Sequence, residues 1–194
     1  FSLGKFSDKL KKWLNDNDKL QPEIRNFVMN WINGGLVDWD ISRDGPYFGF
    51  KIPGEEDKYF YVWLDAPIGY ISSFANYLKR DLKVAEKEWN NSSIIHFIGK
   101  DITYFHFLFW PATLMGSDFK LPDYLVVHGF LTINGEKMSK SRGTFYTAEE
   151  FSQMYNPQFL RFYYAKMLSK KMADINLDFK DLENSINNEL IGNL

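Results

Sequence analysis

The run KMSKSRGT at positions 137–144 combines basic and hydroxyl-bearing residues. Three positive charges, on Lys137, Lys140 and Arg142, fall within six residues, and two serines stand between them. Lysines act as point charges on phosphate oxygens, and hydroxyl and backbone N–H groups add hydrogen bonds. The run therefore indicates a phosphate-binding loop. A solvated basic loop or part of a localisation signal is the alternative interpretation.

Three other polar segments follow stretches that we predict to be β-strands. They are Asp65-Ala66-Pro67, Gly99-Lys100-Asp101 and His128-Gly129. In an open parallel sheet, ligands bind beyond the carboxyl ends of the strands, near the point where the strand order reverses. Each segment alone is also what an ordinary strand-to-helix turn requires. The three together favour one shared ligand site.

Several common site types are excluded by residues that the sequence lacks. There is no GxGxxG, no GxxxxGK[ST] and no GxSxG motif, so a dinucleotide fingerprint, a P-loop and an esterase nucleophile are not supported. The chain has no Cys, which excludes disulfides, Cys-ligated zinc, iron–sulfur clusters and a thiol nucleophile. None of the three His lies in an HExxH pattern, and we predict no metal site.

The composition predicts a soluble globular protein. The 194 residues carry 23 Lys+Arg against 25 Asp+Glu, a net charge of −2, so a nucleic-acid partner would meet a local basic strip and not the whole surface. The apolar stretch 102–115 is too short and too polar to span a bilayer. The chain begins with Phe1 and shows no signal peptide. We therefore expect a cytoplasmic protein without membrane contact, cut from something longer, and an organellar form remains open.

Two kinds of hydrophobic spacing predict the elements that must position these residues. Helical spacing appears around Leu10–Leu14, where Ser7 is a candidate cap, and from Pro22 to Ile32. Short β-prone runs at 59–64, 93–98 and 124–127 alternate with predicted helices, which implies a parallel sheet. The predicted helices between these runs begin at Pro67, Asp81 and Ile102, and Pro111 is expected to kink the last.

The last third of the chain carries clear turn and cap signals. Asn134-Gly135 predicts a type I′ hairpin directly before the basic run. Thr147-x-x-Glu150 predicts a capping box, and Asn156-Pro157 predicts a helix start. A further amphipathic helix is expected over Asp181–Leu190.

The basic run also resembles the KMSKS signature of class I aminoacyl-tRNA synthetases. Four longer blocks resemble, in the same order, the methionyl-tRNA synthetases of that class. They are WDISRDGPYFGFKIP (Trp39–Pro53), YVWLDAPIGY (Tyr61–Tyr70), HFIGKDITYFHFLFWPATLM (His96–Met115) and VVHGFLTINGEKMSKSRGTF (Val126–Phe145).

The resemblance implies an α/β fold, the second half of a Rossmann-like parallel nucleotide-binding fold with flanking helical segments. Residues 1–38 would be the helical tail of a connective insert, and residues 39–147 the second half of the catalytic domain with its KMSKS loop. Residues 148–183 would be a helical connection, and residues 184–194 the start of an anticodon-binding helical bundle.

The resemblance also implies an activity, methionine–tRNA ligation through methionyl-adenylate. The partners would be methionine, ATP with Mg²⁺ and tRNA(Met). Lys137 and Lys140 would be catalytic, neutralising charge on the ATP phosphates. ATP would further contact Gly99, Asp101, His128, Leu131, Ser139 and Ser141. Methionine would contact Trp63, Ala66, Pro67, Tyr70, Ile102, His106 and Trp110, and Arg43 would orient acidic groups around the substrate.

Each of these residues also has an ordinary structural role open to it. The aromatic residues are typical core residues, His106 is typical of a core histidine, and Asp101 can cap the helix that follows. His106 and Trp110 are four residues apart, which places them on one helix face.

Two signatures of the family are missing from this chain. No pair of its histidines forms the His-x-Gly-His motif, and its lack of Cys leaves out the zinc site of the family's insert. We therefore expect the isolated chain to be inactive. Two alternatives remain: the chain is half of another class I synthetase, or it is a non-enzymatic fragment that contacts a nucleotide or tRNA.

Overall fold

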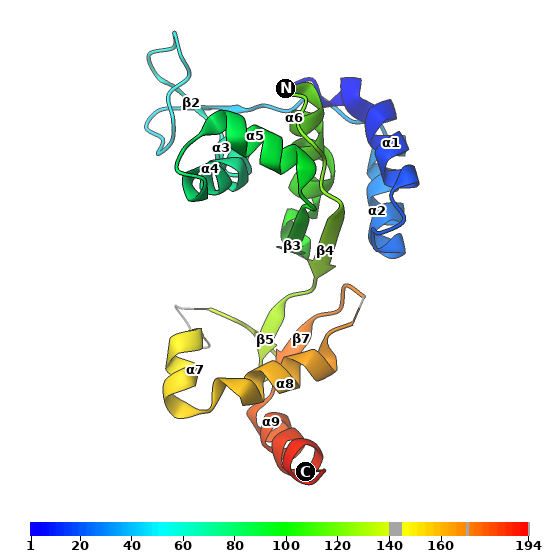
Figure 1. The fold of residues 1–194 in the computed structure, drawn as a ribbon, viewed down its shortest axis with the longest axis vertical. Coiled ribbons are helices and arrows are strands. Elements are labelled where there is room, and N and C mark those ends of the chain that lie inside the picture. Colours follow the sequence, from blue (N-terminus) through cyan, green and yellow to red (C-terminus); the bar gives the residue numbers. More distant parts are fainter. Residues whose placement is uncertain (140–144, 170, 194) are drawn as a thin grey trace. The chain divides into compact units, whose positions relative to one another are not determined.

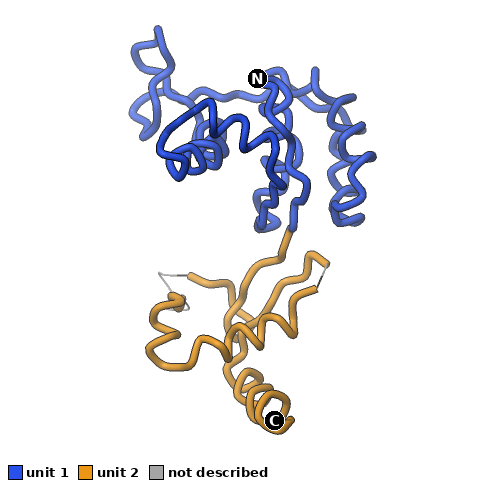
Figure 2. The backbone as a smooth tube through the Cα atoms, viewed as in Figure 1, with its two compact units in different colours: residues 1–126 blue, residues 127–194 orange. Residues whose placement is uncertain are grey.

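A computed structural model describes residues 1–139, 145–169 and 171–193. The chain divides into two compact units, residues 1–126 and residues 127–194, and each is described by itself (Figure 2). Helices and short strands occur in both units, so the predicted α/β class is confirmed (Figure 1). Within the described ranges, no helix is long and apolar enough to cross a membrane.

Two amphipathic helices lie at the start of unit 1, as their apolar spacing predicts. They are α1 (Ser7–Asp16) and α2 (Pro22–Asn33), and they contact each other (Figure 1). The prediction that Ser7 caps α1 is wrong, because its hydroxyl donates a hydrogen bond of 2.8 Å to the carbonyl of Gly4. The chain already turns there in a 3-10 helix, η1 (Leu3–Phe6), so Ser7 is the first residue of α1.

The predicted strand over residues 59–64 forms only in part. Strand β2 (Lys58–Phe60) pairs antiparallel with β1 (Ser42–Asp44), and the following residues form a helical turn, α3 (Val62–Asp65). A short apolar run fits either a strand or a buried helical turn, so its letters alone do not separate the two. The β1–β2 pair also forms a sheet of its own, and the expectation that this run joins the other strands is wrong.

Two predicted helices follow and contact each other: α4 (Ile68–Tyr77) and α5 (Leu82–Asn91). Pro67 lies at the N-cap of α4, where its missing N–H is no loss. The carboxylate of Asp81 accepts hydrogen bonds from the first backbone N–H groups of α5 and caps it. These two residues begin the helices as the sequence predicts.

The remainder of unit 1 is a strand, a long helical crossover and the start of a neighbouring strand, whose last two residues belong to unit 2. The crossover carries a π-helical turn directly before Pro111. In a regular α-helix the proline ring would clash with the carbonyl group four residues earlier, and the wider π-helical turn relieves that clash. The sequence predicts a kink at Pro111, and the structure has a π-helical turn over Phe105–Phe109 shortly before it. The elements are β3 (Ile95–Gly99), η2 (Lys100–Ile102), η3 (Phe105–Phe109), α6 (Trp110–Gly116) and β4 (Tyr124–His128), with β3 and β4 adjacent.

Unit 2 contains a three-stranded sheet in the order β6-β5-β7. Strand β5 (Leu131–Ile133) pairs antiparallel with β6 (Glu136–Lys137) and parallel with β7 (Ile175–Leu177). Asn134 and Gly135 have φ values of 49° and 81°, the positive values that the predicted type I′ turn requires. Strand β7 was not predicted from the sequence.

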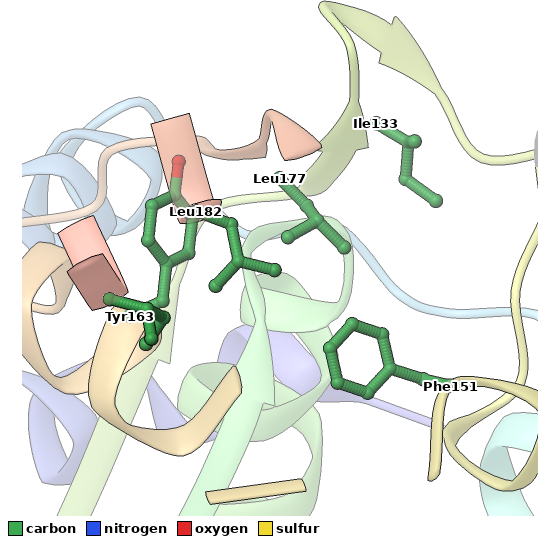
Figure 3. Packing of buried hydrophobic residues seen from close by; sticks show 6 residues of the cluster. Ile133, Phe151, Tyr163, Leu177 and Leu182 are labelled. Atoms are coloured by element: carbon green, nitrogen blue, oxygen red, sulfur yellow. The ribbon is translucent and has the colours of Figure 1, made fainter. Parts of the chain in front are cut away.

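The helices of unit 2 pack their apolar faces into one cluster. Thr147 and Glu150 form the predicted capping box at the start of α7. Figure 3 shows side chains from β5, α7, α8, β7 and α9 gathered together, namely Ile133, Phe151, Tyr163, Leu177 and Leu182. The helices are α7 (Ala148–Met154), α8 (Pro157–Met167), α9 (Phe179–Ser185) and the π-helical η5 (Ile186–Ile191).

Candidate functional site

A cluster of aromatic and histidine rings lies in unit 1, where α4, β3, η3 and α6 meet. The ring centroid of Tyr70 lies 4.6 Å from that of His96, 5.9 Å from that of His106 and 6.1 Å from that of Trp110. The two histidine rings are 5.7 Å apart. Both histidines and Trp110 are almost fully buried, whereas Tyr70 is 39% exposed. Tyr70 therefore forms the accessible edge of a buried group.

Hydrogen bonds fix the proton positions in this cluster. Burial lowers the pKa of His106, so its ring is neutral and carries one proton. Its Nδ1 lies 3.0 Å from the carbonyl oxygen of Ile102, which can only accept, so Nδ1 holds that proton. Nε2 then accepts from the hydroxyl of Tyr70 at 2.9 Å. Burial raises the pKa of Tyr70, which keeps that hydroxyl protonated.

His96 has the more perturbed protonation of the two histidines. Burial, reinforced by the neighbouring His106, lowers its pKa to about 4. The indole N–H of Trp110 donates to Nε2 of His96 at 3.4 Å, which requires this nitrogen to be unprotonated. The cluster is therefore uncharged at neutral pH and suits an apolar, polarisable side chain.

Of the other predicted contact residues, Trp63 contacts the cluster. The ring of Trp63 stacks on Phe105 at 4.2 Å and meets His106 edge-on at 6.3 Å. Ala66 and Pro67 form the junction between α3 and α4, directly before the helix that carries Tyr70. The structure thus brings Trp63, Tyr70, His106 and Trp110 together, with the Ile102 carbonyl bonded to His106. Among the described residues, no ring contact or side-chain hydrogen bond joins Ala66 or Pro67 to this group.

A cavity of about 670 Å³ opens beside this group. Tyr70 and His96 contribute to its wall, so the polar edge of the cluster faces open space. Three aromatic or aliphatic residues around the cavity are exposed, Tyr77 at 81%, Ile95 at 49% and Phe97 at 74%. The full lining is Tyr70, Ser73, Phe74, Tyr77, Trp89, Ser92, Ser93, Ile94, Ile95, His96 and Phe97.

Gly99 and Asp101 lie at the end of β3, as predicted. Gly99 is the last residue of the strand, and the short helix η2 begins directly after it without a side-chain cap. Asp101 is exposed. It lies within η2, and the next helix, η3, has Tyr104 at its N-cap without a side-chain cap, so the alternative role of Asp101 as the cap of the helix that follows is not observed.

Arg43 lies in a different environment from the predicted aromatic contacts. Its guanidinium carbon is 3.9 Å from the ring centroid of Tyr61, and its Nη1 is 3.5 Å from the carboxylate of Asp40. It lines a cavity of about 530 Å³ together with Trp39. Tyr61 and Phe105 both contact the ring of Trp39, at 5.7 Å and 5.3 Å, so packed rings connect Arg43 indirectly to Trp63.

The predicted phosphate and adenine contacts lie in unit 2. His128 is exposed, and its Nδ1 lies 2.8 Å from the carbonyl oxygen of Gly129. Lys137 is exposed on β6, with its Nζ 5.0 Å from the ring centroid of Phe130. Leu131 begins β5, and Ser139 follows β6. Lys140 and Ser141 lie outside the described residues.

Sequence reasoning missed His96 as a member of the cluster. The signal for it was the alternation along the strand, because Ile94, His96 and Ile98 all have their side chains buried. Among the residues that the structure describes, no group of three or more His, Asp or Glu is arranged to hold a metal ion.

Comparison with known protein families identifies the family of the whole chain. The profile described as tRNA synthetases class I (M) matches residues 1–194. The chain belongs to this family. The predicted resemblance is thereby confirmed, and its characteristic sequence extends over both units.

Individual relatives agree with the family. A methionine–tRNA ligase of Leptospira biflexa is 54% identical over 196 residues, which cover 100% of this chain and 29% of that protein. A methionine–tRNA ligase of Psychrobacter sp. is 49% identical, covering 99% of this chain and 30% of that protein. The chain therefore spans about 30% of the length of the curated relatives it matches.

Solved structures show the same fold. The Mycobacterium tuberculosis methionyl-tRNA synthetase in complex with methionyl-adenylate superposes with a TM-score of 0.85 at 32% identity, covering 99% of this chain and 37% of that one. The apo form of the same enzyme gives a TM-score of 0.81 at 28% identity.

Proposed function

We propose that this chain is part of an enzyme that activates methionine with ATP and transfers it to tRNA(Met). The observation that carries the proposal is the uncharged ring cluster of Tyr70, His96, His106 and Trp110 in a chain of this family. The known relatives named as methionine–tRNA ligases, and the methionyl-adenylate complex, support the choice of methionine.

The methionine side chain would lie against these rings. A thioether is polarisable and carries no charge, and each sulfur–aromatic contact contributes about 0.3–1.5 kcal/mol. Neutral histidines in the cluster avoid a charge that an apolar side chain could not solvate. The proposed contacts are Trp63, Ala66, Pro67, Tyr70, Ile102, His106 and Trp110, and Arg43 would orient acidic groups around the substrate.

ATP would arrive with Mg²⁺, and each of its parts would have its own contacts. Gly99 and Asp101 would contact the ribose, and His128 and Leu131 would flank the adenine. Lys137 and Lys140, with Ser139 and Ser141, would bind the phosphates. The lysines would neutralise charge that develops when the methionine carboxylate attacks the α-phosphate, which is catalysis by positioning and electrostatics.

We also propose that the chain holds the second half of a Rossmann-like nucleotide fold. The exposed apolar residues beside the cavity, Tyr77, Ile95 and Phe97, support this, because such faces usually pack against further structure. The segments 1–38, 39–147, 148–183 and 184–194 would then be the insert tail, the catalytic half, the connection and the start of the anticodon-binding bundle. The bacterial origin of the relatives supports a cytoplasmic reaction.

ATP–pyrophosphate exchange with the longer protein tests the proposal. Methionine should drive exchange, and leucine and isoleucine at the same concentration should not. Thermal shift measurements with the three amino acids provide a binding readout that does not depend on turnover. Exchange or stabilisation by leucine or isoleucine in place of methionine would assign the protein to another class I specificity.

The 194-residue chain alone provides the second test. We expect exchange at background, because the family's His-x-Gly-His motif is not among its residues. Exchange at the rate of the longer protein would contradict the proposal that this chain holds only half of the site.

A further inference from the structure

Strand β7 carries a side chain that is hydrogen-bonded to the hairpin turn of unit 2. Oδ1 of Asn176 accepts a hydrogen bond of 2.7 Å from the backbone N–H of Gly135 and one of 3.0 Å from the hydroxyl of Thr132. In a two-residue hairpin the N–H of the second turn residue lies outside the ladder and needs another acceptor. Asn176 supplies that acceptor from a strand more than forty residues along the chain.

Backbone contacts fix the same hairpin from the same side. The N–H of Asn134 donates to the carbonyl of Leu177 at 3.0 Å, and Thr132 pairs with Asn176 in the parallel β5–β7 ladder. The backbone carbonyl of Asn176 accepts a bond of 3.2 Å from the hydroxyl of the buried Tyr163. Asn176 is therefore held by the core of unit 2 and holds the turn.

The hairpin leads directly into the lysine run. Lys137 follows Gly135 by two residues and lies in β6, a strand of two residues that pairs with β5. Its ammonium lies over the ring of Phe130. The backbone N–H of Phe130 donates a hydrogen bond of 2.7 Å to the carboxylate of Asp174. The segment that includes β7 thus holds the chain at both ends of β5, through Phe130 before the strand and Gly135 after it. Strand β5 is the one that pairs with β6, which carries Lys137.

Close approach of the backbones makes this arrangement stiff. A Cβ atom on Gly129 would clash with the carbonyl of Ala173, so the chain before β5 runs directly against the chain before β7. Such contact leaves little room for the hairpin to shift as long as the hydrogen bonds at its turn are present.

We propose that Asn176 is a positioning residue for Lys137 and that it acts on methionine activation through this lysine. The inference rests on the proposed function, in which Lys137 binds the ATP phosphates. A point charge stabilises developing charge only when its position is fixed before the reaction. Releasing Gly135 lets the turn and the lysine two residues later move, and a misplacement of about 1 Å can lower a rate about hundredfold.

Variants of the longer protein separate positioning from folding. Asn176→Ala removes the acceptor, whereas Asn176→Asp keeps an oxygen at that position and should restore most of the rate. Gln153→Ala, which also removes an amide side chain at an exposed position, in α7, is the matched control. Thermal unfolding identifies any variant that fails to fold.

Single-turnover adenylate formation is the main readout. Asn176→Ala should lower its rate constant between tenfold and about hundredfold with the methionine KM unchanged. Transfer of methionine from preformed adenylate to tRNA should keep its rate, since the phosphate step is then complete. An equal loss in both steps, or no rescue by Asn176→Asp, would overturn the proposal.

A double-mutant cycle with Lys137→Ala tests the route of the effect. If Asn176 acts through Lys137, the double variant should be no slower than Lys137→Ala alone. Additive losses would overturn the inference while leaving the proposed function intact. Normal adenylate formation by Lys137→Ala would instead contradict the proposed role of the lysine, and with it the inference.

Discussion

The candidate residues of unit 1 include rings that are removed from water, whereas those of unit 2 include exposed side chains on or beside short strands. His96, His106 and Trp110 are each at most 7% exposed, and their hydrogen bonds are to one another, to Tyr70 and to a backbone carbonyl. Lys137 and His128 are exposed, and the backbone of a hairpin or strand end determines where they lie.

This difference shows two ways of preparing a site. Burial removes charge from histidines, and packing fixes the shape that a side chain of a substrate would meet. An exposed ammonium keeps its charge in water, and it needs its backbone held in order to act at a defined point. Changes in unit 1 should therefore affect stability and substrate affinity, and changes in unit 2 should affect the rate of the chemical step.

Trp110→Ala should produce the largest effect of the variants considered. Trp110 is 1% exposed, and truncating a buried aromatic residue costs about 3–5 kcal/mol of folding free energy. Urea unfolding followed by fluorescence measures the loss. Phe48→Ala is the matched control, because Phe48 is fully exposed and should cost less than about 0.5 kcal/mol. Equal losses would remove the distinction between buried and exposed rings.

Lys140→Ala in the longer protein should affect the rate and leave affinity unchanged. We expect methionine activation to slow about hundredfold, the loss that follows removal of one charge-stabilising group, with the methionine Kd unchanged. Pre-steady-state kinetics and calorimetry measure the two quantities. A weaker methionine affinity with a normal rate would assign this residue to substrate binding. It would contradict the expectation that changes in unit 2 affect the rate of the chemical step.

The protonation of His96 should make folding stability depend on pH. Its pKa is about 4 in the folded protein and near 6.5 when unfolded, so the unfolded chain binds an extra proton between these values. Stability should therefore be nearly constant above about pH 7.5 and fall as pH drops, by about 2 kcal/mol from pH 7.5 to 5. Urea unfolding across this range measures it. His96→Phe should flatten the slope, and an unchanged slope would show that other groups cause it.

Tyr70→Phe should produce the smallest effect. The variant removes the hydroxyl that donates to His106 and keeps the ring, so we expect a loss of about 1 kcal/mol, or roughly fivefold in methionine affinity. Calorimetry on the longer protein measures it. Tyr77→Phe, at a position 81% exposed on the same cavity wall, should leave affinity unchanged. A rate effect without an affinity effect would move Tyr70 to the chemical step.

Local signals in the sequence determined the helices, caps and turns. Pro22, Asp81, Asn134-Gly135 and the Thr147–Glu150 capping box each specify a start or turn through backbone chemistry within a few residues. The spacing of His106 and Trp110 likewise placed both on one face of the crossover helix. These predictions needed no knowledge of distant residues.

Tertiary structure alone decided how segments far apart in the sequence meet. The run at 59–64 became a short strand and a helical turn because β1 paired with only part of it. Strand β7 exists through its pairing with β5, and Asn176 reaches the hairpin only in that pairing. His96 joins Trp110 through the packing of a strand on a helix. A local pattern fixes backbone angles, whereas these contacts depend on which surfaces find each other across the chain, and no short sequence window contains that information.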